Sequence, residues 1–205
     1  MNVFLNPGHA PDGNPDPGAV NAETGLRECD VAKAVADLAE GYLKEAGVTV
    51  VGNLQDDSLA AITDAANGSG ADVFVSIHCN AASPAAQGTE VCIYPGSAEG
   101  EKLGGCILAQ ITDALGTVDR GLKVRTPGVN GLYVLSHTDM PAVLVELAFI
   151  SNEEDVELLS SRQDGFARAI ARGVTDYEQM QGKKTKGWWK GASGQHLFRH
   201  PILLL

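Results

Sequence analysis

The sequence lacks any apolar run long enough to cross a membrane, which needs about twenty predominantly apolar residues. Its densest apolar stretch, PAVLVELAFI at residues 141–150, is short and contains a glutamate. The amino terminus lacks the basic region, the long apolar segment and the cleavage site of a signal peptide. We therefore expect a protein that is made in the cytoplasm without a signal peptide and is not inserted into a membrane.

Cysteine is scarce, and the four cysteines show no C-x-x-C spacing. Without an export signal, this argues against a disulfide framework and favours reduced thiols, most of them buried. A basic face is also missing, because residues 1–178 hold ten basic side chains against all 26 acidic ones. Nucleic-acid binding needs such a face, so we exclude that class of partner for this part of the chain.

The length of 205 residues suits one domain. Apolar strand patterns alternate with helical ones, which predicts a single α/β domain with a central, mostly parallel twisted sheet flanked by helices. We place this domain at residues 1–178. Residues 179–205 hold five basic and no acidic side chains and a tryptophan pair. We expect a linker or tail there, either an artificial extension or the start of a truncated wall-binding module.

The local patterns predict the individual elements. Apolar strands are expected at NVFLN (residues 2–6), VTVVG (48–52), ADVFVSI (71–77), GTEVCIYP (88–95), GLYVLSHT (131–138) and PAVLVELAFI (141–150). RGLKVRTPG (120–128) is expected to be a loop or an edge strand. Helices are expected at 26–46, 59–67, 98–115, 152–159 and around 166–177, with Thr24, Ser58 and Asn152 as N-terminal caps.

Three side chains that can bind zinc stand at predicted element ends. His9 follows the first strand, Glu28 opens the first long helix, and His78 ends the strand ADVFVSI. Ligands bind at the carboxyl edge of parallel strands, so these side chains can converge. Two imidazoles and one carboxylate with an open fourth position are typical of a catalytic zinc site. Cys79 is next to His78, but neighbours in a strand point to opposite faces, so only one of them can face the site.

Glu146 lies within the nine apolar residues of PAVLV and LAFI. A charge is costly to bury there unless it is paired or used, and burial raises the pKa of a carboxyl group. We therefore expect a group that takes a proton from water and passes it to a leaving nitrogen. The alternative is a structural ion pair with Arg120, Lys123 or Arg125. Asn80 is a weaker candidate for a substrate contact, and a turn residue is the alternative for it.

Taken in order, these segments resemble the zinc-dependent N-acetylmuramoyl-L-alanine amidases of phage endolysins and bacterial autolysins. The resemblance spans about residues 2–176 and rests on VFLNPGH, GLRE, DVFVSIHCNAA, GTEVCIYP and VLSHTDMPAVLVELAFISNEEDVELL. It implies one Zn²⁺ held by His9, Glu28 and His78, with Glu146 as the catalytic carboxylate. It also implies cleavage of the amide bond between muramic acid and L-alanine in peptidoglycan, with lysis of the cell wall.

The sequence departs from that family at three places. Asn6 stands where the family usually has aspartate, which weakens the expected carboxylate support for His9. Two arginines common in the family are replaced, one in the stretch VVGNLQDD and one at Ile62. These changes affect the predicted contacts with substrate and leave the predicted metal site intact.

We expect a monomer whose partner is peptidoglycan and which acts on the wall after release from the cell. Two other classes stay open at this stage. One is a zinc peptidase or deacylase of different specificity, because a site with two histidines and one glutamate determines the chemistry and not the substrate. The other is a wall-binding module that keeps the fold without turnover.

Overall fold

The fold is described from a computed structural model, which describes residues 1–182. Six strands form one sheet in the order β2-β1-β3-β6-β4-β5. Their bounds are β1 Asn2–Pro7, β2 Thr49–Asn53, β3 Val73–Asn80, β4 Thr89–Ile93, β5 Asp119–Val124 and β6 Ala142–Phe149. The helices are α1 Glu28–Glu45, α2 Leu59–Gly68, α3 Ala98–Leu115, α4 Tyr133–Ser136, α5 Glu153–Ser161 and α6 Gln163–Met180, with a short 3₁₀ turn at Pro11–Gly13.

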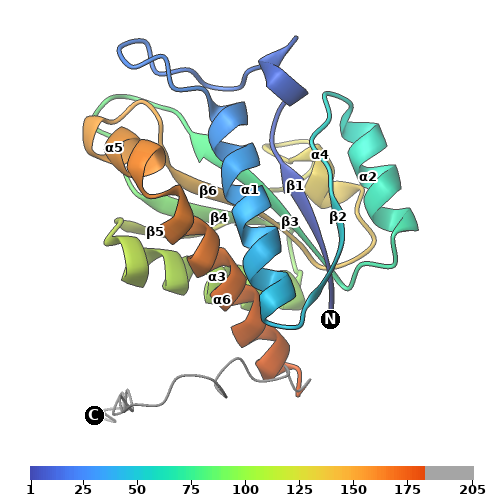
Figure 1. Cartoon of the computed structure of the whole chain (residues 1–205). Coiled ribbons are helices and arrows are strands. Elements are labelled where there is room, and N and C mark those ends of the chain that lie inside the picture. Colours follow the sequence, from blue (N-terminus) through green and yellow to red (C-terminus); the bar gives the residue numbers. More distant parts are fainter. Residues whose placement is uncertain (183–205) are drawn as a thin grey trace, which may run out of the picture.

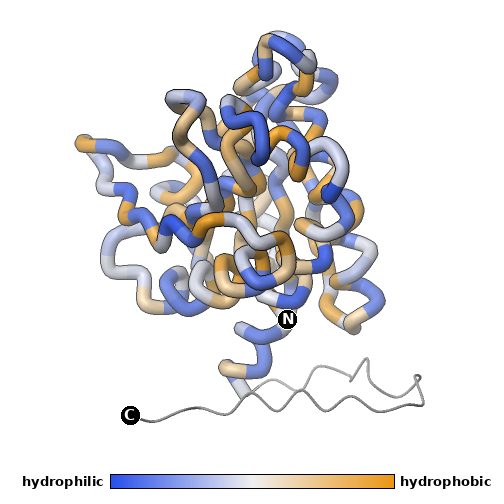
Figure 2. The backbone as a smooth tube through the Cα atoms, turned by 90° about the vertical axis from the view of Figure 1, so that its left-hand side faces the viewer, coloured by the Kyte–Doolittle hydropathy of each residue, from blue (hydrophilic) through white to orange (hydrophobic). Residues whose placement is uncertain are grey.

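Helices cover both faces of the sheet (Figure 1). The larger apolar core lies between the sheet and helices α1, α3 and α6, and a smaller one lies under α2 and α4 on the opposite face. Figure 2 shows hydrophobic and hydrophilic residues alternating along the helices, as expected when one side of each helix packs on the sheet. The predicted α/β domain with a central, mostly parallel sheet is therefore confirmed.

The direction of the strands determines which residues meet at the site. β1, β2, β3 and β6 run parallel, whereas β4 pairs with β6 in the antiparallel sense and carries β5 with it. The beginnings of β4 and β5 consequently lie at the edge where β1, β3 and β6 end. This edge therefore carries side chains from the carboxyl ends of β1, β3 and β6 and from the amino ends of β4 and β5.

Several local predictions are confirmed in detail. The Ser58 hydroxyl caps α2 by accepting from the amide of Ala61 at 3.2 Å, and Asn152 caps α5 through the amide of Asp155 at 3.1 Å. β5 is an edge strand, one of the two alternatives for its segment. The four cysteines are free thiols, and three of them are buried. Within residues 1–182, no helix combines the length and the apolarity that a membrane crossing requires.

Two predictions were wrong. GLYVLSHT contains the short helix α4 and no strand, because the adjacent residues Val134 and Leu135 are both buried against the smaller core, which a one-sided strand could not achieve. Thr24 does not cap α1, which begins after Arg27; the Thr24 hydroxyl instead donates to the side chain of Asn21 at 3.1 Å. Most of the predicted tail, residues 183–205, lies outside the described residues.

Candidate metal centre

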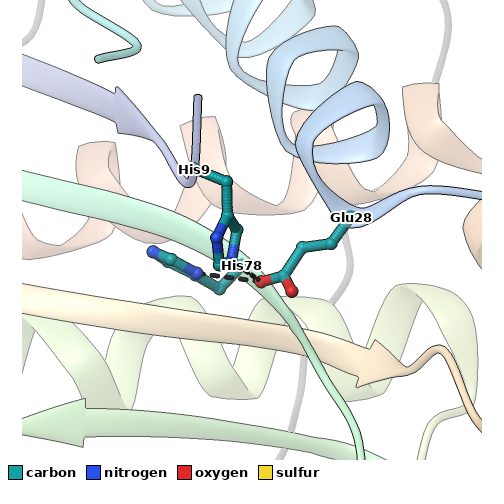
Figure 3. A group of neighbouring side chains, drawn as sticks. All are labelled: His9, Glu28 and His78. Carbon is teal, nitrogen blue, oxygen red and sulfur yellow. Dashed lines mark hydrogen bonds and ion pairs between the residues drawn. The ribbon is translucent and has the colours of Figure 1, made fainter. Parts of the chain in front are cut away.

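His9, Glu28 and His78 converge at the carboxyl edge of the sheet, as their positions in the sequence predict. Oε1 of Glu28 lies 2.9 Å from Nε2 of His9 and 2.9 Å from Nδ1 of His78. His9 lies in the loop after β1, Glu28 opens α1 and His78 belongs to β3, and the three side chains point toward one another (Figure 3). Their ligand atoms all lie within 4.8 Å of one another. This spacing suits side chains that share one cation.

Glu28 is held in its charged form. Its residue is only 4% exposed, and its carboxylate accepts the backbone amides of Ala19 and Cys79 at 2.9 and 3.0 Å. Burial alone would raise the pKa of Glu28, but the hydrogen bonds from His78, His9 and the backbone outweigh it and hold the pKa well below its usual range. A permanently ionised carboxylate is the form that ligates a metal.

His9 is oriented by a carboxylate that the sequence analysis did not identify. Nδ1 of His9 lies 2.8 Å from Oδ2 of Asp16, which leaves Nε2 to face Glu28. Burial opposes the charged form, yet the hydrogen bonds to Glu28 and Asp16 raise the pKa of His9 to about 9. Asp16 also accepts the amide of Gly18 at 2.9 Å, so the loop after β1 is ordered around this residue.

Asp16 supplies the support that Asn6 cannot give. Asn6 is buried, accepts the Ser76 hydroxyl at 2.7 Å and donates to the carbonyls of Pro7 and Leu54. Its side chain is therefore used in joining β1 to its neighbours. A hydrogen-bonded carboxylate behind a ligating histidine fixes the tautomer and the ring orientation, and Asp16 is placed to do this for His9.

The backbone around the three side chains is tightly constrained. His9 has a φ of 67°, which is uncommon for a residue other than glycine. Residues with such a backbone conformation cluster at functional sites. A Cβ on Gly8 would lie 2.3 Å from the His78 ring, and a Cβ on Gly18 would lie 2.5 Å from the His9 ring and 2.6 Å from Oε2 of Glu28. Both positions therefore require glycine so that the chain can wrap closely around the side chains.

The donor set fits a catalytic metal site. Two imidazole nitrogens and one carboxylate oxygen are typical of zinc enzymes that leave a position open for water or substrate, whereas structural sites are usually closed by four ligands. Cys79 does not complete the set, because its side chain is buried in the larger core on the opposite face. Only its backbone amide reaches Glu28.

Glu146 lies beside this cluster on the neighbouring strand. It is paired in register with His78 across β3 and β6, so both side chains project from the same face of the sheet. Its Oε2 is buried without a hydrogen-bond partner among the described residues, and burial raises the pKa of Glu146 to about 7. The alternative of a structural ion pair is not supported within residues 1–182, because Arg120 and Arg125 pair with Glu90 and Lys123 donates to the carbonyl of Arg120.

Glu90 is the second residue that sequence reasoning missed. It lies opposite Glu146 in the antiparallel pair of β4 and β6, is 5% exposed and accepts from Arg120 at 2.9 Å. The segment GTEVCIYP carried the signal, since it places a glutamate among apolar residues. The sequence could not show that Glu90 lies opposite Glu146, because the direction of β4 depends on pairing between residues that are far apart in the sequence.

Asn80 is close to the cluster, but its side chain is already engaged. Nδ2 donates to Oε1 of Glu90 at 3.1 Å, and Oδ1 accepts the amide of Ala81 at 2.9 Å. A substrate contact would have to replace one of these bonds. That role for Asn80 stays a prediction.

A cavity of about 310 Å³ opens next to His9 and His78. Three carboxylates line it, from Asp16, Asp56 and Asp57, together with Tyr133 and apolar residues of α2 and α4. Ile62 also lines this cavity, as do Asp56 and Asp57 of the stretch VVGNLQDD. Both places where the family's arginines are replaced therefore lie in or next to the same wall of the cavity. One side of the candidate site is therefore acidic and apolar.

Comparisons with known proteins agree with this geometry. The family described as N-acetylmuramoyl-L-alanine amidase (Amidase_3) matches residues 3–176. The uncharacterised protein YqiI of Bacillus subtilis is 36% identical over 183 residues, which cover 85% of this chain and 84% of that protein. The N-acetylmuramoyl-L-alanine amidase LytC of B. subtilis is 32% identical over 183 residues, but the match covers only 35% of its length.

Solved structures show the same relationship. A crystal structure of an N-acetylmuramoyl-L-alanine amidase from Clostridium difficile 630 has a TM-score of 0.79 and 30% sequence identity, and the match covers 88% of this chain and 98% of that one. The AmiC2 amidase of Nostoc punctiforme has a TM-score of 0.77 and 31% identity, covering 87% and 97% of the two chains. By fold, by sequence and by the convergence of His9, Glu28 and His78, this chain belongs to the N-acetylmuramoyl-L-alanine amidase family.

Proposed function

We propose that this protein is a zinc-dependent amidase that hydrolyses the bond between the lactyl group of muramic acid and L-alanine in peptidoglycan. The observation that carries the proposal is the placement of a buried, unpaired carboxylate, Glu146, in register with one histidine of a cluster of two histidines and one glutamate. A binding module would not need to bear the cost of burying that carboxyl group.

His9, Glu28 and His78 would hold one Zn²⁺ through Nε2, Oε1 and Nδ1. The pKa of Glu28 is already low without the ion, so this ligand needs no deprotonation before metal binding. When bound, the ion supplies Lewis acidity toward the amide carbonyl and toward water. Asp16 binds Nδ1 of His9 and so turns Nε2 toward the ion, which this nitrogen can ligate once it has lost its proton.

Glu146 would carry the proton. As a carboxylate it accepts a proton from the water that attacks the lactyl carbonyl, and it then donates that proton to the departing nitrogen of L-alanine. A pKa of about 7 suits both steps near neutral pH, because the group is then neither too weak a base nor too weak an acid. No residue within 1–182 hydrogen-bonds Oε2, so no partner there fixes the charged form of this carboxyl group.

The products of wall digestion test this assignment. Incubation with purified peptidoglycan should release free muramic lactyl carboxylate and new amino-terminal L-alanine in equal amounts, and a chelator should stop both. New amino groups elsewhere in the peptide would indicate a peptidase of different specificity. Binding to walls without either product would indicate a wall-binding module.

We further propose that the activity is used to lyse cell walls after release from the cell. The endolysin of Bacillus phage SPP1 is 33% identical over 182 residues and covers 83% of this chain, which supports this use. Release of dye from labelled walls, with and without chelator, measures the lytic step directly. Walls that lose the amide bond but stay intact would separate amidase activity from lysis.

A further inference from the structure

Basic side chains gather at β5, the edge strand on the side of Glu146 that is away from His78. Arg120 and Lys123 belong to the edge strand β5, and Arg125 follows directly after it. Arg120 and Arg125 both reach Glu90, which lies opposite Glu146 across β6 and β4. This basic edge stands out in a chain whose formal net charge is −11.

Arg120 is locked in place by three contacts. Its Nε donates to Oε2 of Glu90 at 2.9 Å, its Nη1 reaches the carbonyl of Gln87 at 3.4 Å, and its guanidinium lies 4.7 Å from the centre of the Phe149 ring. These contacts give Arg120 a structural role, in which its guanidinium holds Glu90, Gln87 and Phe149 in position.

Arg125 is held more loosely. Its Nη2 reaches Oε1 of Glu90 only at 3.4 Å, where Asn80 already donates at 3.1 Å, and its Nε contacts the thiol of Cys92 at 3.1 Å. A thiol is a weak acceptor, and nothing in residues 1–182 accepts a hydrogen bond from Nη1. The side chain is 26% exposed. Arg125 therefore presents unused donors to solvent beside Glu146.

The opposite side of the site has the opposite charge. Asp16, Asp56 and Asp57 line the cavity next to His9 and His78. An anionic group would be repelled from that cavity and attracted to the basic edge. The charges therefore favour one orientation of a substrate that carries such a group. A guanidinium also matches a carboxylate in geometry, because its parallel N–H groups can donate to both oxygens.

We infer that Arg125 binds a carboxylate of the stem peptide and thereby places the peptide over β4 and β5, with the muramic acid on the side of the acidic cavity. This inference rests on the proposed amidase function and adds the orientation of the substrate. Arg125 is then a specificity-determining residue, and Glu90 positions it.

The test uses two muramoyl tripeptides that are identical except that the free carboxylate of the second stem residue is an amide in one of them. The full chain loaded with Zn²⁺ should cleave the carboxylate form with a kcat/KM about 10- to 100-fold above that of the amide form, as expected for a charged hydrogen-bonded pair. Arg125→Gln should lose this preference through a higher KM for the carboxylate form, so that the ratio of the two kcat/KM values falls toward one.

Two further variants separate this role from a structural one. Arg125→Lys keeps the charge without the paired donors and should retain part of the preference. Lys102→Gln removes one exposed positive charge on α3, across the sheet, and should leave the preference intact. Circular dichroism and thermal melting check that each variant is folded.

Three results would overturn the inference. A wild-type protein that cleaves both tripeptides at equal kcat/KM does not use the carboxylate, although it would still be an amidase. An Arg125→Gln variant that loses activity equally on both tripeptides would show a structural role. If the wild-type protein cleaves neither at the lactyl amide, the proposed function fails and the inference fails with it.

Discussion

His78 and Glu146 are register partners on adjacent parallel strands, which places an imidazole of the candidate metal site and a buried carboxyl group side by side on one face of the sheet. Parallel strands lie about 4.8 Å apart, so the two side chains start from neighbouring points and share the same surroundings. His78 belongs to the side chains that converge on a common centre, whereas Oε2 of Glu146 has no partner within residues 1–182. Replacing His78 and replacing Glu146 should therefore affect different properties of the protein.

Replacing either residue should separate metal binding from turnover. Glu146→Gln should keep one zinc per chain and lose activity by about 10²- to 10⁴-fold, the usual contribution of a general acid or base. His78→Ala should lose the metal itself. Metal analysis together with amidase assays checks both, and Glu153→Gln, on the first turn of α5, serves as a control. Turnover by Glu146→Gln at a near wild-type rate would refute the assignment.

The burial of Glu146 should reduce the stability of the metal-free protein at alkaline pH. The pKa of Glu146 is about 7 in the folded chain against 4.5 for the free group, so the folded state holds a proton that the unfolded state has lost. The free energy of unfolding should therefore fall as the pH rises from 4.5 to 7 and stay low above that. Glu146→Gln escapes this loss and should be more stable than the wild type by about 3 kcal/mol at pH 8.

Denaturant unfolding of both metal-free proteins between pH 4 and pH 8 measures this difference. At pH 4 the two should be similar in stability, because the carboxyl group is then protonated in both states. A constant difference across this range would mean that Glu146 ionises as freely in the folded protein as in the unfolded one.

Asp16 should matter for metal affinity more than for the fold. Asp16→Asn removes the charge behind His9 and should weaken zinc binding by about 10- to 100-fold, the usual effect of losing such a partner. Asp12→Asn makes the same chemical change in the same loop, at a residue whose side chain makes no hydrogen bond within residues 1–182, and should leave the affinity unchanged. Competition with a chromogenic chelator gives both dissociation constants. Equal affinities for the two variants would exclude a supporting role for Asp16.

The glycine at position 18 should be required for the metal centre. Gly18→Ala places a Cβ within 2.6 Å of His9 and Glu28 at a φ of 68°, so it should reduce metal binding and lower stability. Gly25 has a φ of 72° with nothing within 4 Å of its added Cβ. Gly25→Ala should therefore pay only the backbone cost of about 1–2 kcal/mol and keep the metal. Metal content and melting temperature compare the two variants.

Much of the fold could be predicted from local pattern. Apolar runs marked the strands, and single polar side chains such as Ser58 and Asn152 marked helix starts, because both signals depend on residues close in sequence. The same holds for His9 and His78, since a parallel strand brings its carboxyl end to a known edge. α4 was missed because an apolar run of four to eight residues fits a strand and a short helix equally well.

The surroundings of the site depend on pairing between distant residues and could not be predicted in this way. Glu90 meets Glu146 only because β4 runs antiparallel to β6, and no local pattern shows that direction. Asp16 reaches His9 because the loop after β1 folds back on itself, with the amides of Ala10 and Gly18 both donating to Asp16. The sequence therefore predicts the three side chains that converge in the candidate metal site, but not the carboxylates that lie beside them.

Hydrolysis of a defined muramoyl peptide in water labelled with ¹⁸O tests the central claim most directly. If water attacks the lactyl carbonyl at the site formed by His9, Glu28, His78 and Glu146, mass spectrometry should find one ¹⁸O in the lactyl carboxylate of the muramic acid product, and a chelator should abolish the labelling. Label in a carboxylate of the peptide, or labelled lactyl product that forms equally well after the metal has been removed, would contradict the account.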